Sequence, residues 1–144
     1  PFRVQLAGAT MIDHISLPVS DYARSRTFYD KALGALGYKV VMEVTDAPDF
    51  VGAGYGPDDR PEPAFWIGAG REPGPPPVSP DGQHIAFQAA DRAAVDAFFR
   101  AALAAGGRSN GPPGLRPHYH PSYYAAFVLD PDGHRLEAVC HRAE

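Results

Sequence analysis

The stretch HISLPVSDYARSRTFYDKALGALG, residues 14–37, is decisive for the fold, because HIAFQAADRAAVDAFFRAALAAGG follows it 70 positions later at 84–107. The two stretches align without a gap. Alanine richness accounts for some matches, but not for histidine, aspartate, aromatic and glycine matches together. We infer two copies of one supersecondary unit. The matched pairs include His14/His84, Asp21/Asp91, Phe28/Phe98, Tyr29/Phe99 and Gly37/Gly107.

Each copy has the pattern of a strand that leads into a helix. In the first copy, residues 14–19 alternate in hydrophobicity with period two, which is typical of a strand. Ser20-Asp21 is an N-cap signal, and apolar residues then recur at helical spacing as far as Leu36. Gly37 is suited to end the helix, since glycine adopts a left-handed conformation at low cost. The second copy repeats this pattern.

Further strands are expected after each helix. A turn, Asp130-Pro131-Asp132-Gly133, has proline and glycine at favoured places and joins the last two strands. We expect the order strand–helix–strand–strand–strand, twice. The expected strands after the helices are 38–44, 50–56 and 64–68 in the first copy, and 123–129 and 135–141 in the second.

The fold class predicted from this order is α+β. Two βαβββ modules, 11–69 and 84–141, would be related by a pseudo-two-fold axis and form a curved, partly closed mixed sheet with the helices outside. The linker 70–83 is rich in proline. Residues 11–144 are then one domain, as their number permits. Residues 1–10 are set apart as a tag remnant or a flexible arm.

Composition excludes several kinds of partner. The net charge is −4 and no basic run occurs, so a nucleic-acid partner is not expected. No apolar stretch approaches the roughly 20 residues of a membrane span. Cys140 is the single cysteine, so no intramolecular disulfide can form, which fits a reducing, cytoplasmic location. We expect Cys140 to be a buried apolar residue and His134, in the turn, to be solvated.

Strand alternation predicts that several polar side chains lie on the sheet face away from the helices. His14 and Ser16 would point into the concave face, and so would His84 and Gln88 in the second copy. Glu137 lies between two apolar neighbours in the sequence, so it would point into the same face if those neighbours cover the helix side. Two imidazoles and one carboxylate are the donors of a facial triad for divalent iron, manganese, nickel or zinc. The alternative is that these are ordinary hydrogen-bonded or solvent-facing strand residues.

Three motifs carry a family resemblance that spans residues 11–141. Asp13-His14-Ile15, His84-Ile85-Ala86-Phe87 and the run Leu129 to Gly133 followed by Leu136-Glu137 resemble the vicinal oxygen chelate superfamily of glyoxalases, bleomycin-resistance proteins and extradiol dioxygenases. The resemblance implies that the metal ligands are His14, His84 and Glu137. It also implies frequent dimers, although two modules in one chain can close a site alone.

The sequence departs from the family pattern in two places. Glyoxalase I enzymes have a fourth ligand in the first module, but the repeat puts Ile67 opposite Glu137, and loop differences move the match only to Trp66 or Gly68. The chain therefore resembles the three-ligand dioxygenases and fosfomycin-resistance enzymes. Compared with the dioxygenase signature, His120 has the spacing of the histidine that precedes the last hairpin. Phe127, however, occupies the position of a tyrosine in that signature.

The segment Arg116 to Tyr124, RPHYHPSYY, is a candidate loop over the site. His120 or a tyrosine, Tyr123 among them, would act as acid, base or substrate donor, and Arg116 would hold an anionic group. The alternative is a proline-rigid loop packed by aromatic residues. Aromatic and apolar residues of strand 64–68 are candidates for a pocket wall or for plain core. The full candidate set is catalytic Glu137, His120 and Tyr123, with Ser16, Phe65, Ile67, Gln88, Arg116 and Tyr124 binding substrate.

These residues predict a glyoxalase-like enzyme that uses a divalent metal ion. Its small-molecule substrate would chelate the metal through adjacent oxygens and undergo lyase, isomerase or dioxygenase chemistry. The alternative function is non-catalytic binding of a small molecule, or antibiotic resistance of the bleomycin or fosfomycin type.

Overall fold

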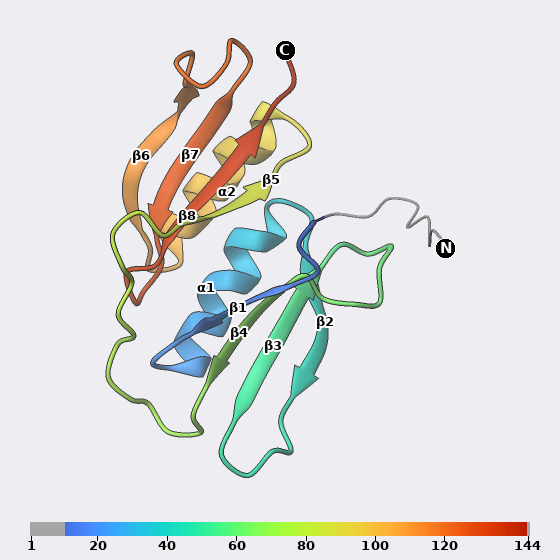
Figure 1. Cartoon of the computed structure of the whole chain (residues 1–144), viewed down its shortest axis with the longest axis vertical. Helices are drawn as coiled ribbons and strands as arrows, with labels where there is room; N and C mark the ends of the chain where they lie inside the picture. The colour runs from blue at the N-terminus through green and yellow to red at the C-terminus, as the bar shows by residue number, and fades with distance from the viewer. Residues whose placement is uncertain (1–10, 144) are drawn as a thin grey trace, which may run out of the picture.

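The computed structural model describes residues 11–143 and shows two modules placed along the long axis of the molecule (Figure 1). Residues 1–10, expected to be a tag remnant or arm, lie outside the described residues. The first module contains β1 (Ile15–Pro18), α1 (Tyr22–Gly34), β2 (Lys39–Val44), β3 (Val51–Gly56) and β4 (Phe65–Ala69). The second contains β5 (Ile85–Gln88), α2 (Arg92–Ala104), β6 (Arg108–Leu115), β7 (Tyr124–Leu129) and β8 (Arg135–Cys140). This order confirms the predicted two-module α+β fold.

Each module builds its own four-stranded mixed sheet. The strand orders are β1-β4-β3-β2 and β5-β8-β7-β6, with β1 parallel to β4, β5 parallel to β8, and the remaining pairs antiparallel. No ladder joins the two sheets within residues 11–143, so one chain does not form one continuous curved sheet. The modules meet instead through side chains, since α1 contacts α2 and Phe65 packs edge-on against Phe87 with ring centroids 5.1 Å apart.

Both helices begin where the sequence indicates. The carboxylate of Asp21 accepts the backbone N–H of Arg24 at 3.0 Å, and that of Asp91 accepts the N–H of Ala94 at 2.8 Å. These bonds satisfy amide donors that have no partner inside a helix. Each helix then packs on one face of its own sheet and leaves the other face for chemistry.

Strand β6 is the element that the sequence analysis did not locate. Its residues, RSNGPPGL, contain two glycines and two prolines, which are depleted in strands. The pairing with β7 shifts register twice, and Gly111 has a φ of 146°, so the strand is bulged. Tertiary pairing with β7 overrides an unfavourable local preference here.

The turn Asp130–Gly133 joins the two modules from the inside. The carboxylate of Asp130 accepts the Tyr29 hydroxyl at 2.6 Å, together with the backbone N–H groups of Asp132 at 2.9 Å and His134 at 2.8 Å. Burial raises the pKa of Asp130 above its ordinary value, against the lowering effect of the Tyr29 hydrogen bond. Helix α1 is thereby tied to the β7–β8 turn.

His134 completes this connection, and the expectation that it is solvated is wrong. Only 5% of its surface is exposed, and its Nε2 donates to the carbonyl of Pro18 at 2.7 Å. The Asp132 carboxylate accepts the N–H of Ser20 at 2.9 Å and a guanidinium N–H of Arg24 at 2.8 Å. The turn has a polar sequence that is typical of an exposed turn, but it is buried because the first module packs on it.

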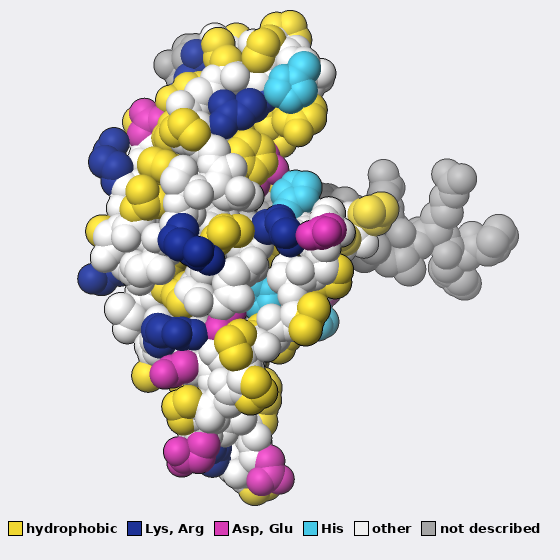
Figure 2. All heavy atoms as spheres, turned by 90° about the vertical axis from the view of Figure 1, so that its left-hand side faces the viewer, with side chains coloured by type: hydrophobic (Ala, Val, Ile, Leu, Met, Phe, Trp, Pro, Cys, Tyr) yellow, Lys and Arg dark blue, Asp and Glu magenta, His cyan; other side chains and the backbone are white. Residues whose placement is uncertain are grey.

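Charges of both signs occur on the face of the molecule that Figure 2 presents. Figure 2 shows Lys and Arg side chains interspersed with Asp and Glu on the side it presents. No helix within residues 11–143 has the length and apolar character needed to cross a membrane.

Two glycines give a matched stability prediction. A Cβ at Gly107 would lie 2.7 Å from the Phe28 ring and 2.8 Å from the carbonyl of Ala102, whereas a Cβ at Gly34, in α1, would meet nothing within 4 Å. We expect Gly107→Ala to lower the free energy of unfolding by about 1–3 kcal/mol through overpacking. Gly34→Ala should raise it by roughly 0.4–1 kcal/mol. Urea unfolding of both variants measures the difference, and equal effects would contradict this packing argument.

Candidate functional site

The second module brings a histidine, a glutamate and a tyrosine together on the sheet face away from α2. Glu137 pairs with Ala86 across the β5–β8 ladder, and only 2% of its surface is exposed. Its Oε2 lies 3.1 Å from Nε2 of His84, and its Oε1 accepts the Tyr123 hydroxyl. Two cis ligands of one divalent ion, each about 2.1 Å away, are about 3 Å apart. The His84–Glu137 spacing therefore suits metal ligation.

Tyr123 acts on Glu137 as a hydrogen-bond donor. Burial raises the pKa of Tyr123 above its ordinary value, and the hydrogen bond to the Glu137 carboxylate raises it further. A phenol with a raised pKa keeps its proton at neutral pH, so Tyr123 is suited to orient the carboxylate rather than to act as a base.

This coupling predicts a pH-titration result. In Glu137→Gln the tyrosine loses its charged acceptor, so the pKa of Tyr123 should fall toward its ordinary value of 10. NMR of protein labelled with ¹³C at tyrosine Cζ, with Tyr123→Phe to assign the resonance, measures the pKa. An unchanged Tyr123 titration in the glutamine variant would show that the carboxylate does not influence the phenol.

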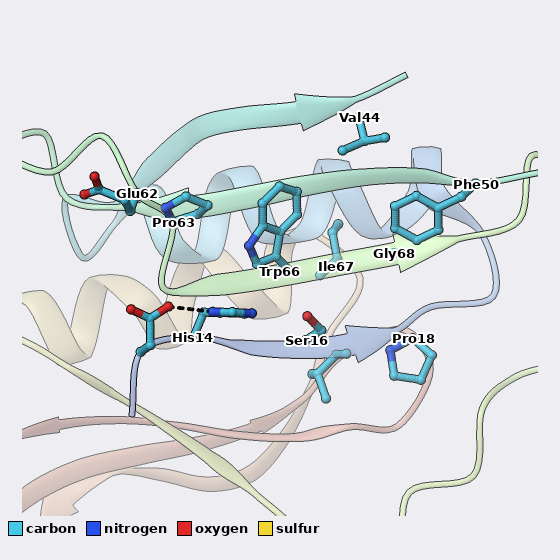
Figure 3. A pocket seen from close by; sticks show the side chains of 12 residues that line it. His14, Ser16, Pro18, Val44, Phe50, Glu62, Pro63, Trp66, Ile67 and Gly68 are labelled. Atoms are coloured by element: carbon cyan, nitrogen blue, oxygen red, sulfur yellow. Dashed lines mark hydrogen bonds and ion pairs between the residues drawn. The ribbon is translucent and has the colours of Figure 1, made fainter. Parts of the chain in front are cut away.

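The first module places His14 at one end of a separate cavity of about 700 Å³ (Figure 3). Nδ1 of His14 lies 2.6 Å from Oδ1 of Asp13, and this hydrogen bond lowers the pKa of Asp13. A carboxylate on Nδ1 orients the ring and leaves Nε2 for a ligand, as in many metal sites. Ser16 and Trp66 line the same cavity.

One chain does not gather the three predicted ligands at a point. His84 and Glu137 line a hollow of about 380 Å³, which is not the cavity that His14 lines. Within residues 11–143, the group of three whose ligand atoms lie within 4.8 Å of one another is Asp130, Asp132 and His134. The expectation that both histidines meet inside one chain is therefore wrong.

The Asp130 group has the donor types of a metal site, but its atoms are already engaged. Both Asp130 oxygens accept hydrogen bonds, both Asp132 oxygens accept bonds from Ser20, and His134 Nε2 donates to a backbone carbonyl. A metal ion would have to break these bonds between the modules. We therefore assign the group a structural role.

His120 is also fully engaged. Its Nδ1 accepts the N–H of Ser122 at 3.0 Å, so the proton resides on Nε2, which lies 2.8 Å from Nδ1 of His141 and donates to it. The His120 ring packs edge-on against Tyr123. The predicted acid–base residue thus contacts the Tyr123 ring and has both ring nitrogens in hydrogen bonds.

The predicted substrate-binding residues do not gather at one place. Phe65 lies in the core, and Tyr124 donates to Asp96 of α2 at 2.7 Å, so both lie on the helix side of the sheets. Ile67 is fully buried in the core and also contributes to the lining of the His14 cavity. Gln88 lines a different hollow of about 310 Å³. Ser16, as stated, faces the His14 cavity.

Arg116 lies on the same sheet face as Glu137. Its guanidinium stacks on Phe127, the cross-strand partner of Glu137, at 5.4 Å from the ring centroid. The same guanidinium donates to the carbonyl of Pro112 at 2.7 Å. A cation held in this way is suited to an anionic substrate group.

The strand register identifies the residue at the position of the missing fourth ligand. Glu137 pairs with Ala86 in the second module, and Trp66 pairs with Ser16, the repeat equivalent of Ala86, in the first. Trp66, not Ile67, therefore corresponds to Glu137. The first module has an indole where a glyoxalase I ligand is expected.

Sequence reasoning did not identify Phe50 and Glu62, which also line the His14 cavity. Phe50 stands just before a strand that the sequence marks as weak because it is rich in glycine. Those glycines were the available signal, since a glycine-rich sheet face leaves room for rings from elsewhere in the chain.

Comparisons with known proteins show which family shares this fold. A family model described as the Glyoxalase/Bleomycin resistance protein/Dioxygenase superfamily matches residues 11–138. A crystal structure of a glyoxalase/bleomycin resistance protein from Albidiferax ferrireducens T118 is 31% identical, with a TM-score of 0.68, covering 90% of this chain and 98% of that one. A search of curated proteins returned no match.

Two further structures show similarity of different extent. An E144Q mutant of glyoxalase I from Zea mays is 25% identical with a TM-score of 0.66; the alignment covers 88% of this chain and 45% of the maize chain. A glyoxylase/bleomycin resistance protein/dioxygenase domain from Frankia sp. EAN1pec is 17% identical with a TM-score of 0.68, covering 93% and 99%. The Frankia likeness concerns the fold alone.

Proposed function

Because the chain belongs to the glyoxalase/bleomycin resistance protein/dioxygenase superfamily, we propose that it is a metal-dependent enzyme acting on a small substrate with adjacent oxygens. The observation that carries this proposal is the buried Glu137 carboxylate beside His84. Its two oxygens have separate partners, Nε2 of His84 at 3.1 Å and the Tyr123 hydroxyl. A buried carboxylate held in this way suits a metal ligand.

The ligand set in the proposal is His14, His84 and Glu137. Two neutral nitrogens and one anionic oxygen fit divalent iron, manganese, nickel or zinc, and leave positions for substrate oxygens. When bound, such an ion supplies a Lewis acid that polarises the chelated oxygens. Asp13 orients His14, and Tyr123 orients Glu137 by donating to its Oε1.

The proposal assembles each site from two copies of the chain. His14 and the His84–Glu137 pair lie in separate hollows of one chain. Each half presents its donors on a sheet face that no helix covers. A homodimer that places the first module of one copy against the second module of the other completes the ligand set.

Other residues of the chain have binding and proton roles in this proposal. Arg116, stacked on Phe127, attracts an anionic end of the substrate. Glu137 also has the role of proton acceptor in this proposal, and Tyr123, which retains its proton, holds the carboxylate in place. The chemistry is of the lyase, isomerase or dioxygenase kind.

Metal titration and mixing of variants test the proposal together. Chelator-treated protein is titrated with Fe²⁺, Mn²⁺, Ni²⁺ and Zn²⁺ by calorimetry, with one ion per chain expected. His14→Ala and Glu137→Gln should each bind weakly alone. A heterodimer of the two variants contains one site with all three ligands out of two. Random pairing of an equimolar mixture makes about half of the dimers heterodimers, so mixing should restore about a quarter of the wild-type capacity. Absence of restoration would refute assembly from two copies.

Activity is assayed with the loaded enzyme on catechols, methylglyoxal–thiol adducts and fosfomycin. Metal-dependent turnover of any of these compounds would support the proposal that the protein is an enzyme. Wild-type protein that is folded, dimeric and binds none of the four ions would overturn the proposal and leave the alternative, a metal-free binding protein. The apolar cavity beside His14 favours that second candidate.

A further inference from the structure

The His14 cavity has a floor made of two aromatic rings. Trp66 and Phe50 both line it, and 42% of the Phe50 surface is exposed although the side chain is large and apolar. Val44 and Pro63 add apolar walls, whereas His14 lies toward one end (Figure 3). The cavity therefore combines a polar end with an apolar, ring-lined remainder.

Glycines in the sheet beneath allow both rings to lie against the backbone. Gly54 is the cross-strand partner of Trp66, and Gly52 is that of Gly68, so these four positions share one sheet face. A Cβ at Gly54 would lie 2.8 Å from the Trp66 indole. A Cβ at Gly68 or Gly52 would lie 2.5 Å or 2.9 Å from the Phe50 ring.

The segment that presents Phe50 is anchored. Arg71, just beyond β4, donates to three backbone carbonyls of the β2–β3 connection, those of Thr45, Ala47 and Pro48, at 2.5–3.0 Å. The connection that leads into Phe50 is thereby held against the end of β4. An exposed aromatic ring in a pre-organised position loses little conformational entropy when it binds a ligand.

We propose that the Trp66–Phe50 floor is a subsite for a flat aromatic ring system, so that the substrates of this protein carry such a ring beside their metal-chelating oxygens. The inference deepens the proposed function and rests on it for the chelating oxygens; the ring subsite itself needs no metal. Trp66 has a double effect, because it removes a fourth ligand and provides an aromatic surface in its place.

Ring shape separates this subsite from a general apolar pocket. Aromatic pairs gain about 0.5–1.5 kcal/mol beyond the burial of area, in offset or edge-on arrangements. A saturated ring system of the same carbon skeleton is thicker and has no π face. The floor should therefore prefer the aromatic member of a matched pair of ligands.

The experiment compares 2-naphthol with decahydro-2-naphthol on wild-type protein treated with a chelator. Calorimetry should give an affinity for 2-naphthol about tenfold higher than for the saturated alcohol. Trp66 is the one tryptophan in the chain, so its emission should be quenched by 2-naphthol. Phe50→Leu and Trp66→Leu keep an apolar side chain but remove a flat ring, and each should weaken 2-naphthol binding about fivefold to tenfold.

Phe99→Leu is the matched control, since it removes an aromatic ring from α2 outside the cavity. It should leave 2-naphthol binding unchanged. Equal affinity for the two alcohols, or Phe50 and Trp66 variants that bind like wild type, would overturn the ring subsite. Metal titration of the same samples keeps the two proposals apart, because loss of ring preference with intact metal binding refutes only the subsite. Ring binding without metal binding refutes only the enzyme.

Discussion

Glu137→Gln should lower the affinity for divalent metal at least about 100-fold while the protein stays folded. The substitution keeps the size of the side chain but removes the anionic oxygen that lies 3.1 Å from His84 Nε2. Loss of groups that only support a ligand already costs about 10–100-fold, and loss of a ligand should cost more. Any metal-dependent activity should fall with it.

A carboxylate elsewhere provides the control for this prediction. Glu72 is exposed and is not among the residues that line the His84–Glu137 hollow, so Glu72→Gln changes the net charge equally without removing a proposed ligand. Calorimetric titration of Mn²⁺ into both variants, with circular dichroism to check folding, gives the comparison. Wild-type affinity in Glu137→Gln would remove the glutamate from the ligand set.

Asp130→Ala should lower the free energy of unfolding by about 3–5 kcal/mol at neutral pH, a large part of the total for a domain of this size. The side chain is 1% exposed and accepts hydrogen bonds from the Tyr29 hydroxyl and two backbone amides. Alanine leaves these donors buried without partners, and it disconnects α1 from the β7–β8 turn.

The size of this effect should depend on pH. Because burial raises the pKa of Asp130 in the folded state, the folded protein holds that proton more tightly than the unfolded chain. The contribution of Asp130 is thus fully present below its ordinary pKa of 3.8 and declines as pH rises through the folded-state value. The difference between wild type and Asp130→Ala should therefore be larger in acid than at neutral pH.

Urea unfolding over a range of pH measures both effects. Asp58→Ala, which removes an exposed carboxylate paired with Lys39, should change stability by less than about 1 kcal/mol. Tyr29→Phe should cost about 1–2 kcal/mol, and a double-mutant cycle with Asp130→Ala should show coupling between the two. Additive effects would indicate that the Tyr29–Asp130 bond contributes nothing of its own.

Local sequence patterns were enough to predict most of the fold. The repeat of residues 14–37 at 84–107 predicted two modules, and the capping roles of Asp21 and Asp91 follow from contacts within three residues along the chain. Period-two alternation correctly placed Leu136 in the core and Glu137 on the opposite face. Cys140 is fully buried, as its position in that alternation predicts.

Features that depend on how distant segments pack were missed. Strand β6 forms through pairing with β7 despite its glycines and prolines. Phe50 reaches the His14 cavity because glycines of two strands leave space and Arg71 anchors the preceding connection. His134 looked like a turn residue, and no local signal indicated that Pro18 would cover it.

By itself the sequence determined the duplicated α+β fold and the sheet face on which each candidate ligand lies, because periodicity and capping act over a few neighbouring residues. Only the tertiary structure decided that His14 lies apart from His84 and Glu137 within one chain. Where two modules of identical pattern dock is set by contacts between residues a hundred positions apart, such as Tyr29 with Asp130. Such contacts leave no periodic trace in either segment.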